Sequence, residues 1–228
     1  MEIRVLAFAG VREILGGMEL HVELPDGATL ADLRAALDDA HPELEPYWER
    51  LAVAVDGRLG NSEMKLSPGC EVALLPPVSG GSESDGEAAT VLVEAPIDRR
   101  AVIERVATRA RGAVLVFEGT VRDSHKGRPV THLVYDAYRA MADETLRRIA
   151  REIEAAERDL AVEIVHRLGE VGAGEASVVI AVGSPHRDTA YAASREALER
   201  LKSEVPIWKR EHYADGETEW REEEPLGD

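Results

Sequence analysis

The chain has 228 residues, enough for one large or two small domains, and its 44% hydrophobic and 31% charged content is that of an ordinary globular protein. Its formal net charge of -17 disfavours nonspecific binding to nucleic acid or to an anionic membrane. No apolar run reaches membrane-spanning length and the first residues lack the features of a signal peptide, so we expect a cytoplasmic protein. The single cysteine, Cys70, cannot form an internal disulfide, which agrees with a reducing compartment.

The first eighty residues carry the pattern of a small mixed domain. Apolar and polar residues alternate over 3–7 and again over 20–24 with a glycine pair between them, which predicts a hairpin. Thr29, followed three residues later by Asp32, is typical of a helix start, and leucines and alanines at helical spacing follow it. His41-Pro42 is expected to stop that helix.

Two more short strands, over 51–55 and 71–75, complete the order strand, strand, helix, strand, strand of a ubiquitin-like β-grasp domain. The last strand runs into Pro76-Pro77-Val78-Ser79-Gly80-Gly81. A diglycine can enter a narrow active site because it has no side chain to obstruct it, and six extended residues reach on the order of 20 Å. The alternative is that these glycines only open a flexible linker.

Residues 82–89 are small, polar and acidic, with nothing to bury, and predict a flexible linker. The predicted organisation is a carrier-like domain over 1–81, the linker, and a second domain over 90–228. Net charges of -8, -3 and -6 fall on these three parts.

The second domain mixes helices and strands without a regular alternation, so we predict an α+β fold. Its predicted strands cover 90–94, 112–122, 133–138, 162–168 and 177–183, and its predicted helices cover 96–110, 141–156 and a segment from Asp188 to Leu201. A turn over 124–129 would return the chain so that 133–138 pairs with 112–122.

Basic residues gather at the ends of these elements, where binding residues usually lie. They are Arg122, His186, Arg187, Lys202, Lys209 and Arg210. His186-Arg187 stands just before a helix N-terminus, which favours an anion. If the six converge they form a cationic pocket for a phosphate-bearing anion, and crowding would favour the neutral, reactive amine of a lysine. Taken singly, each is an ordinary solvated surface charge.

Residues 1–81 resemble the small sulfur-carrier subunit of molybdopterin synthase, and residues 90 to about 221 resemble its large catalytic subunit. Three separated motifs carry the second resemblance. They are Gly112-Ala113-Val114-Leu115-Val116-Phe117-Glu118-Gly119-Thr120-Val121-Arg122, Ser184-Pro185-His186-Arg187, and Leu201-Lys202 followed by Pro206-Ile207-Trp208-Lys209-Arg210-Glu211.

The resemblance implies a reaction. The carrier's terminal glycine, adenylated and converted to a thiocarboxylate, delivers sulfur to cyclic pyranopterin monophosphate, and two rounds give the dithiolene of molybdopterin. By position Gly81 would bear the sulfur, and Lys202 and Lys209 match the family's essential lysines, with Lys202 as base or covalent catalyst. The implied substrate contacts are Arg122, His186, Arg187 and Arg210 for phosphate and pterin, with Thr120, Val121 and Glu211 at neighbouring binding positions.

The resemblance also implies partners. These are a homodimer through the C-terminal domain, an adenylating enzyme, and a sulfur donor for the carrier domain, with no metal and no permanently bound cofactor. The fusion departs from the family pattern, because Gly81 is joined to Ser82 whereas a thiocarboxylate requires a free carboxyl group. We expect cleavage after Gly81, by a protease or, less readily, through the Ser82 hydroxyl. The alternative is an uncleaved first domain that serves as a docking or carrier module beside a non-catalytic binding domain.

Several reactive residues have a simpler interpretation. Cys70 is expected to be a small core residue rather than a sulfur relay, and His166, on an alternating strand, to be structural. His125 and His132 flank a turn and are expected to be solvated. Trp208 is either a packing anchor or one wall of the pocket.

Overall fold

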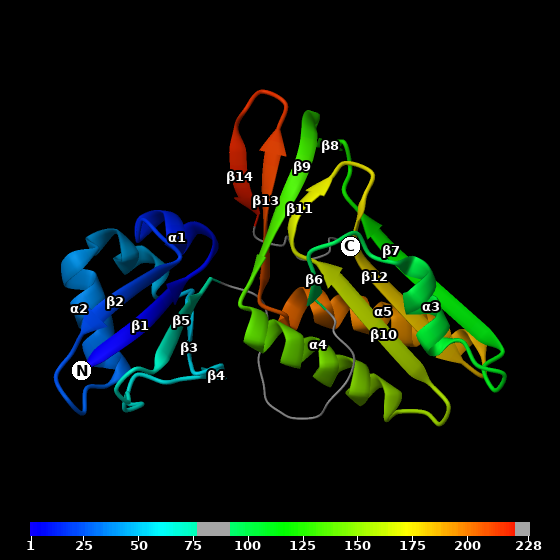
Figure 1. Cartoon of the computed structure of the whole chain (residues 1–228), viewed down its shortest axis with the longest axis horizontal. Coiled ribbons are helices and arrows are strands. Elements are labelled where there is room, and N and C mark those ends of the chain that lie inside the picture. Colours follow the sequence, from blue (N-terminus) through cyan, green and yellow to red (C-terminus); the bar gives the residue numbers. More distant parts are fainter. Residues whose placement is uncertain (77–91, 222–228) are drawn as a thin grey trace. The chain divides into compact units, whose positions relative to one another are not determined.

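The computed structural model describes residues 1–76 and 92–221, and the chain divides into two compact units, Met1–Ser82 and Glu83–Asp228 (Figure 1). Each unit has its own hydrophobic core. The predicted diglycine, with Gly81, and the predicted linker over 82–89 lie outside the described residues. Among the helices that are described, none combines the length and apolar character needed to cross a membrane.

The first unit is one sheet covered by a helix. Its elements are β1 (Glu2–Ala7), α1 (Ala9–Ile14), β2 (Glu19–Glu23), α2 (Leu30–Ala40), the 3-10 helix η1 (Pro42–Tyr47), β3 (Ala52–Val55), β4 (Arg58–Leu59) and β5 (Glu71–Leu75). The strand order is β2-β1-β5-β3-β4, with β1 parallel to β5 and the other neighbours antiparallel. Leu30, Leu33 and Leu37 of α2 enter the core. This is the predicted β-grasp arrangement.

Local signals in this unit are confirmed except at one connection. The Thr29 hydroxyl accepts from the backbone N–H of Asp32, and the Asp32 carboxylate accepts from that of Thr29 at 2.7 Å, so α2 has its predicted capping box. β1 and β2 pair as expected, but the simple hairpin turn is wrong. The short helix α1 stands between them and buries Ala9 and Val11, and six residues are too few to show an amphipathic repeat. Cys70 is buried as expected, and burial raises the pKa of its thiol.

The second unit contains two sheets. Its elements are β6 (Leu92–Val93), α3 (Arg99–Val106), β7 (Ala113–Thr120), β8 (Ser124–His125), β9 (Arg128–Ala137), α4 (Arg139–Glu154), β10 (Ala161–Arg167), β11 (Gly169–Gly172), β12 (Ala176–Ser184), α5 (Arg187–Glu204), β13 (Ile207–Tyr213) and β14 (Thr218–Arg221). One sheet has the order β6-β10-β12-β7, and the other has the order β11-β9-β13-β14 with β8 paired to β9.

Helices cover both faces of the four-stranded sheet. Along β12, Ile180 and Val182 pack in the core that α4 and α5 share, whereas Val179 and Ala181 pack with α3 (Figure 1). Because alternate residues of a strand point to opposite faces, a strand covered on both sides has a continuous apolar run, as β12 has from Val178 to Val182. The mixture of helices and sheets confirms the predicted α+β class.

The predicted pairing of 112–122 with 133–138 is wrong. β7 pairs with β12, with Phe117 opposite Ile180, whereas β9 lies in the other sheet between β11 and β13. β12 is buried along nearly its whole length and therefore needs a strand on each side, which β10 and β7 provide. The helix expected over 96–110 also ends early, at Val106.

Candidate functional site

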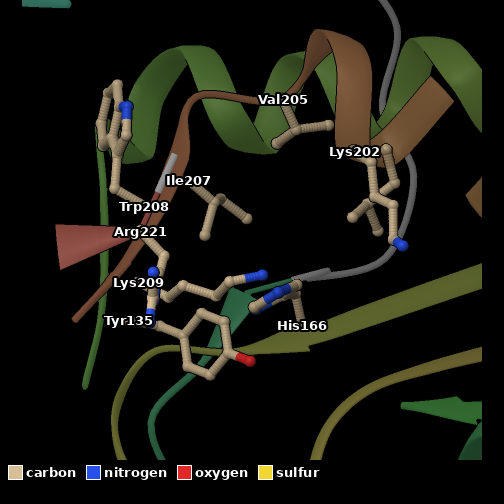
Figure 2. A pocket seen from close by; sticks show the side chains of 9 residues that line it. Tyr135, His166, Lys202, Val205, Ile207, Trp208, Lys209 and Arg221 are labelled. Atoms are coloured by element: carbon tan, nitrogen blue, oxygen red, sulfur yellow. The ribbon is translucent and has the colours of Figure 1, made fainter. Parts of the chain in front are cut away.

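A small pocket of about 40 Å³ lies in the second unit at the C-terminal end of α5. Aliphatic side chains form part of its wall, and its polar or aromatic lining consists of Tyr135, His166, Lys202, Trp208, Lys209 and Arg221 (Figure 2). The two lysines predicted to be catalytic, Lys202 and Lys209, therefore line the same pocket. Trp208 is both buried and part of the wall.

The turn between α5 and β13 brings the two lysines together. A residue before proline avoids the helical conformation, and Val205 is extended with ψ of 124°, so α5 ends just before Pro206. The carbonyl of Pro206 accepts from the N–H of Tyr138, which fixes the turn beside α4. β13 then starts at once and places Lys209 opposite Tyr135 of β9. Opposed residues of neighbouring strands share a face, so both side chains enter the pocket.

His166 contributes an uncharged imidazole to this basic pocket. Its Nδ1 lies 2.9 Å from the carbonyl oxygen of Arg167, and its ring meets that of Tyr135 edge-on with centroids 5.0 Å apart. Burial lowers the pKa of His166 to about 4, against the effect of that hydrogen bond, and the Lys209 ammonium lowers it further. At neutral pH His166 is therefore uncharged.

Glu211 acts on the pocket through Arg221. The Glu211 carboxylate is buried and accepts from the Tyr213 hydroxyl at 2.6 Å and from Nε of Arg221 at 3.2 Å, while Arg221 also donates to the Tyr213 oxygen at 2.8 Å. Burial alone would raise the pKa of Glu211, but these two hydrogen bonds hold it below its usual range. Glu211 therefore stays ionised and fixes the guanidinium that lines the pocket.

The remaining predicted site residues do not line this pocket. Arg210 follows Lys209 on β13 and places its guanidinium 5.3 Å from the centre of the Trp220 ring. Val121 is buried, whereas Thr120, the last residue of β7, and Arg122, just beyond it, are exposed. Thr120, Val121 and Arg122 lie at the end of β7 in the four-stranded sheet, whereas Lys209 lies on β13 in the other sheet. Gly81 lies outside the described residues.

His186 and Arg187 lie at the opposite end of α5 from Lys202. His186 is the N-cap of the helix and Arg187 its first residue, while Lys202 is in the last turn. Fifteen residues of α-helix span about 22 Å, so one chain does not bring these groups together.

Three pocket residues, Tyr135, His166 and Arg221, were not predicted as site residues, since they lie on three separate strands. One sequence signal does point to the pocket. The chain has 27 basic residues of which four are lysines, and two of those four line the pocket. Arginine keeps its proton in proteins, whereas lysine can lose it and react, so the rarity of lysine would have singled out Lys202 and Lys209.

Comparisons with known proteins agree with both halves of the chain. Residues 92–204 match the family model described as MoaE protein, and residues 5–81 match that of the ThiS family. The chain is 44% identical over 126 residues to the molybdopterin synthase catalytic subunit of Bacillus subtilis, which covers 55% of this chain and 80% of that protein. The match to the catalytic subunit of Culex quinquefasciatus is 46% over 129 residues, covering 55% and 82%.

A solved structure also matches the second domain. The crystal structure of molybdopterin synthase from Staphylococcus aureus aligns with a TM-score of 0.56 and 40% identity, covering 59% of this chain and 97% of that one. These matches confirm the predicted resemblance and the predicted fold of both domains. The chain therefore belongs to the molybdopterin synthase catalytic subunit family and carries a ThiS-family, ubiquitin-like domain ahead of its catalytic domain.

Proposed function

We propose that this enzyme of molybdenum cofactor biosynthesis carries both partners of a sulfur transfer on one polypeptide. Gly81, as a thiocarboxylate, gives its sulfur to cyclic pyranopterin monophosphate and returns as a carboxylate, and two such transfers form the dithiolene of molybdopterin. The observation that carries the proposal is the convergence of Lys202 and Lys209, with Arg221, on one pocket.

The charge of the pocket suits this chemistry. An anionic phosphate ester and an anionic thiocarboxylate repel each other, and fixed cations offset that repulsion most strongly where water is excluded. Lys202 serves as the base or covalent catalyst, and Lys209 and Arg221 stabilise the negative charge. Arg122, His186, Arg187 and Arg210 hold the phosphate and the pterin, and the reaction requires no metal and no bound cofactor.

A homodimer through the C-terminal domain would complete the site. Since His186 and Arg187 are about 22 Å along α5 from Lys202, a second copy is the source that could bring an equivalent pair to this pocket. A face for that copy is available, because β7 is an edge of the four-stranded sheet as described and Val114 and Val116 on it are exposed.

Charging of the carrier domain requires processing of the chain. A free Gly81 carboxyl group arises by cleavage between Gly81 and Ser82, after which an adenylating enzyme and a sulfur donor act on it. Intact mass of the protein purified from its own cells tests this step. A fragment ending at Gly81, heavier by the exchange of oxygen for sulfur, is expected, and a single uncut species in cells that make the cofactor would instead make the first domain a docking element.

The transfer itself is tested with the cleaved protein. The carrier fragment as thiocarboxylate is mixed with the catalytic domain and cyclic pyranopterin monophosphate, and molybdopterin is measured. Formation by the unmodified protein and its loss in Lys202→Ala are expected, with Lys65→Ala, an exposed lysine of the first unit, as the matched control. Equal rates in the two variants would remove Lys202 from the mechanism.

A further inference from the structure

A neutral imidazole shares the pocket with three cationic side chains. His166 is 4% exposed at the end of β10, and Figure 2 shows the Lys209 side chain extending toward its ring. Tyr135 lies beside both, since it is opposite Lys209 in the β9–β13 pair and packs edge-on against His166. The three side chains therefore form one group drawn from three strands.

The hydrogen bond of His166 to the backbone fixes its tautomer. A carbonyl oxygen can only accept, so Nδ1, 2.9 Å from the Arg167 carbonyl oxygen, carries the hydrogen and donates it. In the neutral ring the other nitrogen, Nε2, then keeps its lone pair. His166 therefore presents an acceptor from a buried position.

An acceptor without charge is useful in this pocket. In their charged forms, the side chains of Lys202, Lys209 and Arg221 can only donate hydrogen bonds. A partly buried ammonium needs acceptors to hold its direction, but a carboxylate there would cancel its charge and repel an anionic ligand. An imidazole Nε2 accepts from the ammonium and leaves its charge intact.

We propose that His166 is a positioning residue for Lys209. Its Nε2 accepts a hydrogen bond from the Lys209 ammonium and directs that group into the pocket. The effect on turnover rests on the proposed function, whereas the contact between the two side chains does not.

The scarcity of lysine makes the contact measurable. The full chain labelled with ¹⁵N-lysine has four side-chain amino groups, and Lys209→Arg identifies the signal of Lys209. We expect slow hydrogen exchange at the Lys209 amino group and a nuclear Overhauser contact between its side chain and the His166 ring. Absence of that contact in the unmodified protein overturns the proposal, even if the variants below fail to fold.

Two variants separate the two nitrogens of His166. The amide of His166→Asn reaches the position of Nδ1 and still donates to the Arg167 carbonyl, but it lacks an acceptor at the position of Nε2. The longer His166→Gln restores a polar atom there. We expect His166→Asn to accelerate hydrogen exchange at Lys209 and leave Lys202 unchanged, and His166→Gln to keep the slow exchange. Equal exchange in both variants and in the unmodified protein would overturn the proposal.

Turnover gives the second readout. In molybdopterin formation, we expect His166→Asn to lower kcat about tenfold with little change in KM, because the Lys209 ammonium is then wrongly oriented. We expect His166→Gln to recover most of the lost kcat. Equal losses of kcat in the two variants would mean that His166 only packs, which contradicts the proposal. If exchange responds as expected while the unmodified protein makes no molybdopterin, the contact stands and the proposed function fails.

Discussion

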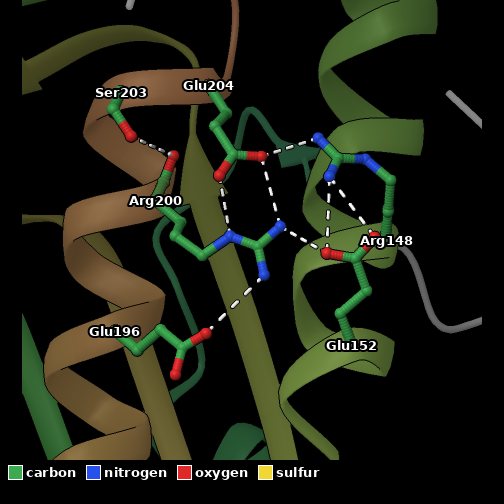
Figure 3. Close-up of polar contacts among 6 residues, drawn as sticks. All are labelled: Arg148, Glu152, Glu196, Arg200, Ser203 and Glu204. Carbon is green, nitrogen blue, oxygen red and sulfur yellow. Dashed lines mark hydrogen bonds and ion pairs between the residues drawn. The ribbon is translucent and has the colours of Figure 1, made fainter. Parts of the chain in front are cut away.

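Two groups of basic side chains lie near the C-terminal end of α5, and they differ in the residues that accompany them. The first joins α5 to α4 (Figure 3). Arg148 of α4 donates to Glu204 at 2.7 Å, and Arg200 of α5 donates to Glu204 at 2.7 Å and to Glu152 at 2.5 Å. In this group each guanidinium has a carboxylate partner, so its charge serves the packing of two helices.

The pocket is lined by a different set of side chains. Arg221 is paired with carboxylates there, but Lys202 and Lys209 are lysines and their neighbour His166 is uncharged. Arg200 and Lys202 stand two positions apart on α5, and residues at that spacing point to different faces of a helix. One helix end thus carries an ion-paired arginine on one face and, on another, the lysine that we propose for the chemistry, which agrees with the permanent charge of arginine and the titratable amine of lysine.

The largest expected effect tests the different roles of Arg200 and Lys202 directly. Lys202→Arg keeps the positive charge but removes an amine that can act as base or nucleophile, so we expect molybdopterin formation to fall on the order of 10²–10⁴-fold. Arg200→Lys keeps the charge that its carboxylate partners need and is expected to stay within about threefold of the unmodified rate. Single-turnover rates decide this. An active Lys202→Arg would mean that the pocket needs only charge at this position.

Breaking the ion-pair network of Arg148, Glu152, Arg200 and Glu204 is instead expected to lower the free energy of unfolding. The Arg148 side chain is 8% exposed and that of Glu204 is 19% exposed, and Arg148→Met leaves this partly buried carboxylate with one of its two guanidinium partners. Loss of one partner of a fully buried pair costs about 3–5 kcal/mol, and we expect a smaller loss here because Glu204 is partly exposed and keeps Arg200 as a partner. Urea unfolding of the full chain measures this effect. Arg195→Met, at an exposed position of α5, is the control and is expected to change little.

Acid is expected to act on the pocket side through His166. The pKa of His166 in the folded protein is about 4, below the usual 6.5, so the unfolded chain binds the proton more tightly and stability falls as pH drops from 6.5 toward 4. At 1.36 kcal/mol per pKa unit the loss approaches about 3 kcal/mol. Carboxylates titrate in the same range, so the measurement is the difference in unfolding free energy between the unmodified chain and His166→Gln at each pH. A difference in unfolding free energy that does not change with pH would contradict the lowered pKa of His166.

The first domain could be predicted well because its signals are local. The Thr29–Asp32 capping box and the alternation around Ile3 and Val22 act within a few residues of the chain. Pairing over longer separations leaves no such trace, and β7 was therefore assigned to the wrong neighbour. β13 was not predicted as a strand, because its buried positions include the charged Glu211, which breaks the apolar alternation.

The candidate site likewise contains some residues that the sequence could predict and others that it could not. Lys202 and Lys209 lie seven residues apart on either side of a proline turn, so a sequence motif contains both. Tyr135, His166 and Arg221 reach the pocket from β9, β10 and β14, and only the folded sheets bring them there. A histidine on an alternating strand gives the same pattern whether its ring packs or lines a pocket, so sequence alone could not assign His166.

The smallest expected effect concerns an ion pair only slightly longer than those that join α4 to α5. On α3, Arg100 and Glu104 are 2.8 Å apart, but their side chains are 87% and 62% exposed. Water screens such a pair and both side chains lose freedom on pairing, so we expect a coupling below about 0.5 kcal/mol in a double-mutant cycle of Arg100→Ala and Glu104→Ala. The same cycle for Arg148 and Glu204 should give a clearly larger coupling, because these side chains are only 8% and 19% exposed and water screens them less. Equal couplings would mean that distance alone sets these energies, and burial could then no longer explain why the network's arginines stabilise the fold while exposed arginines do not.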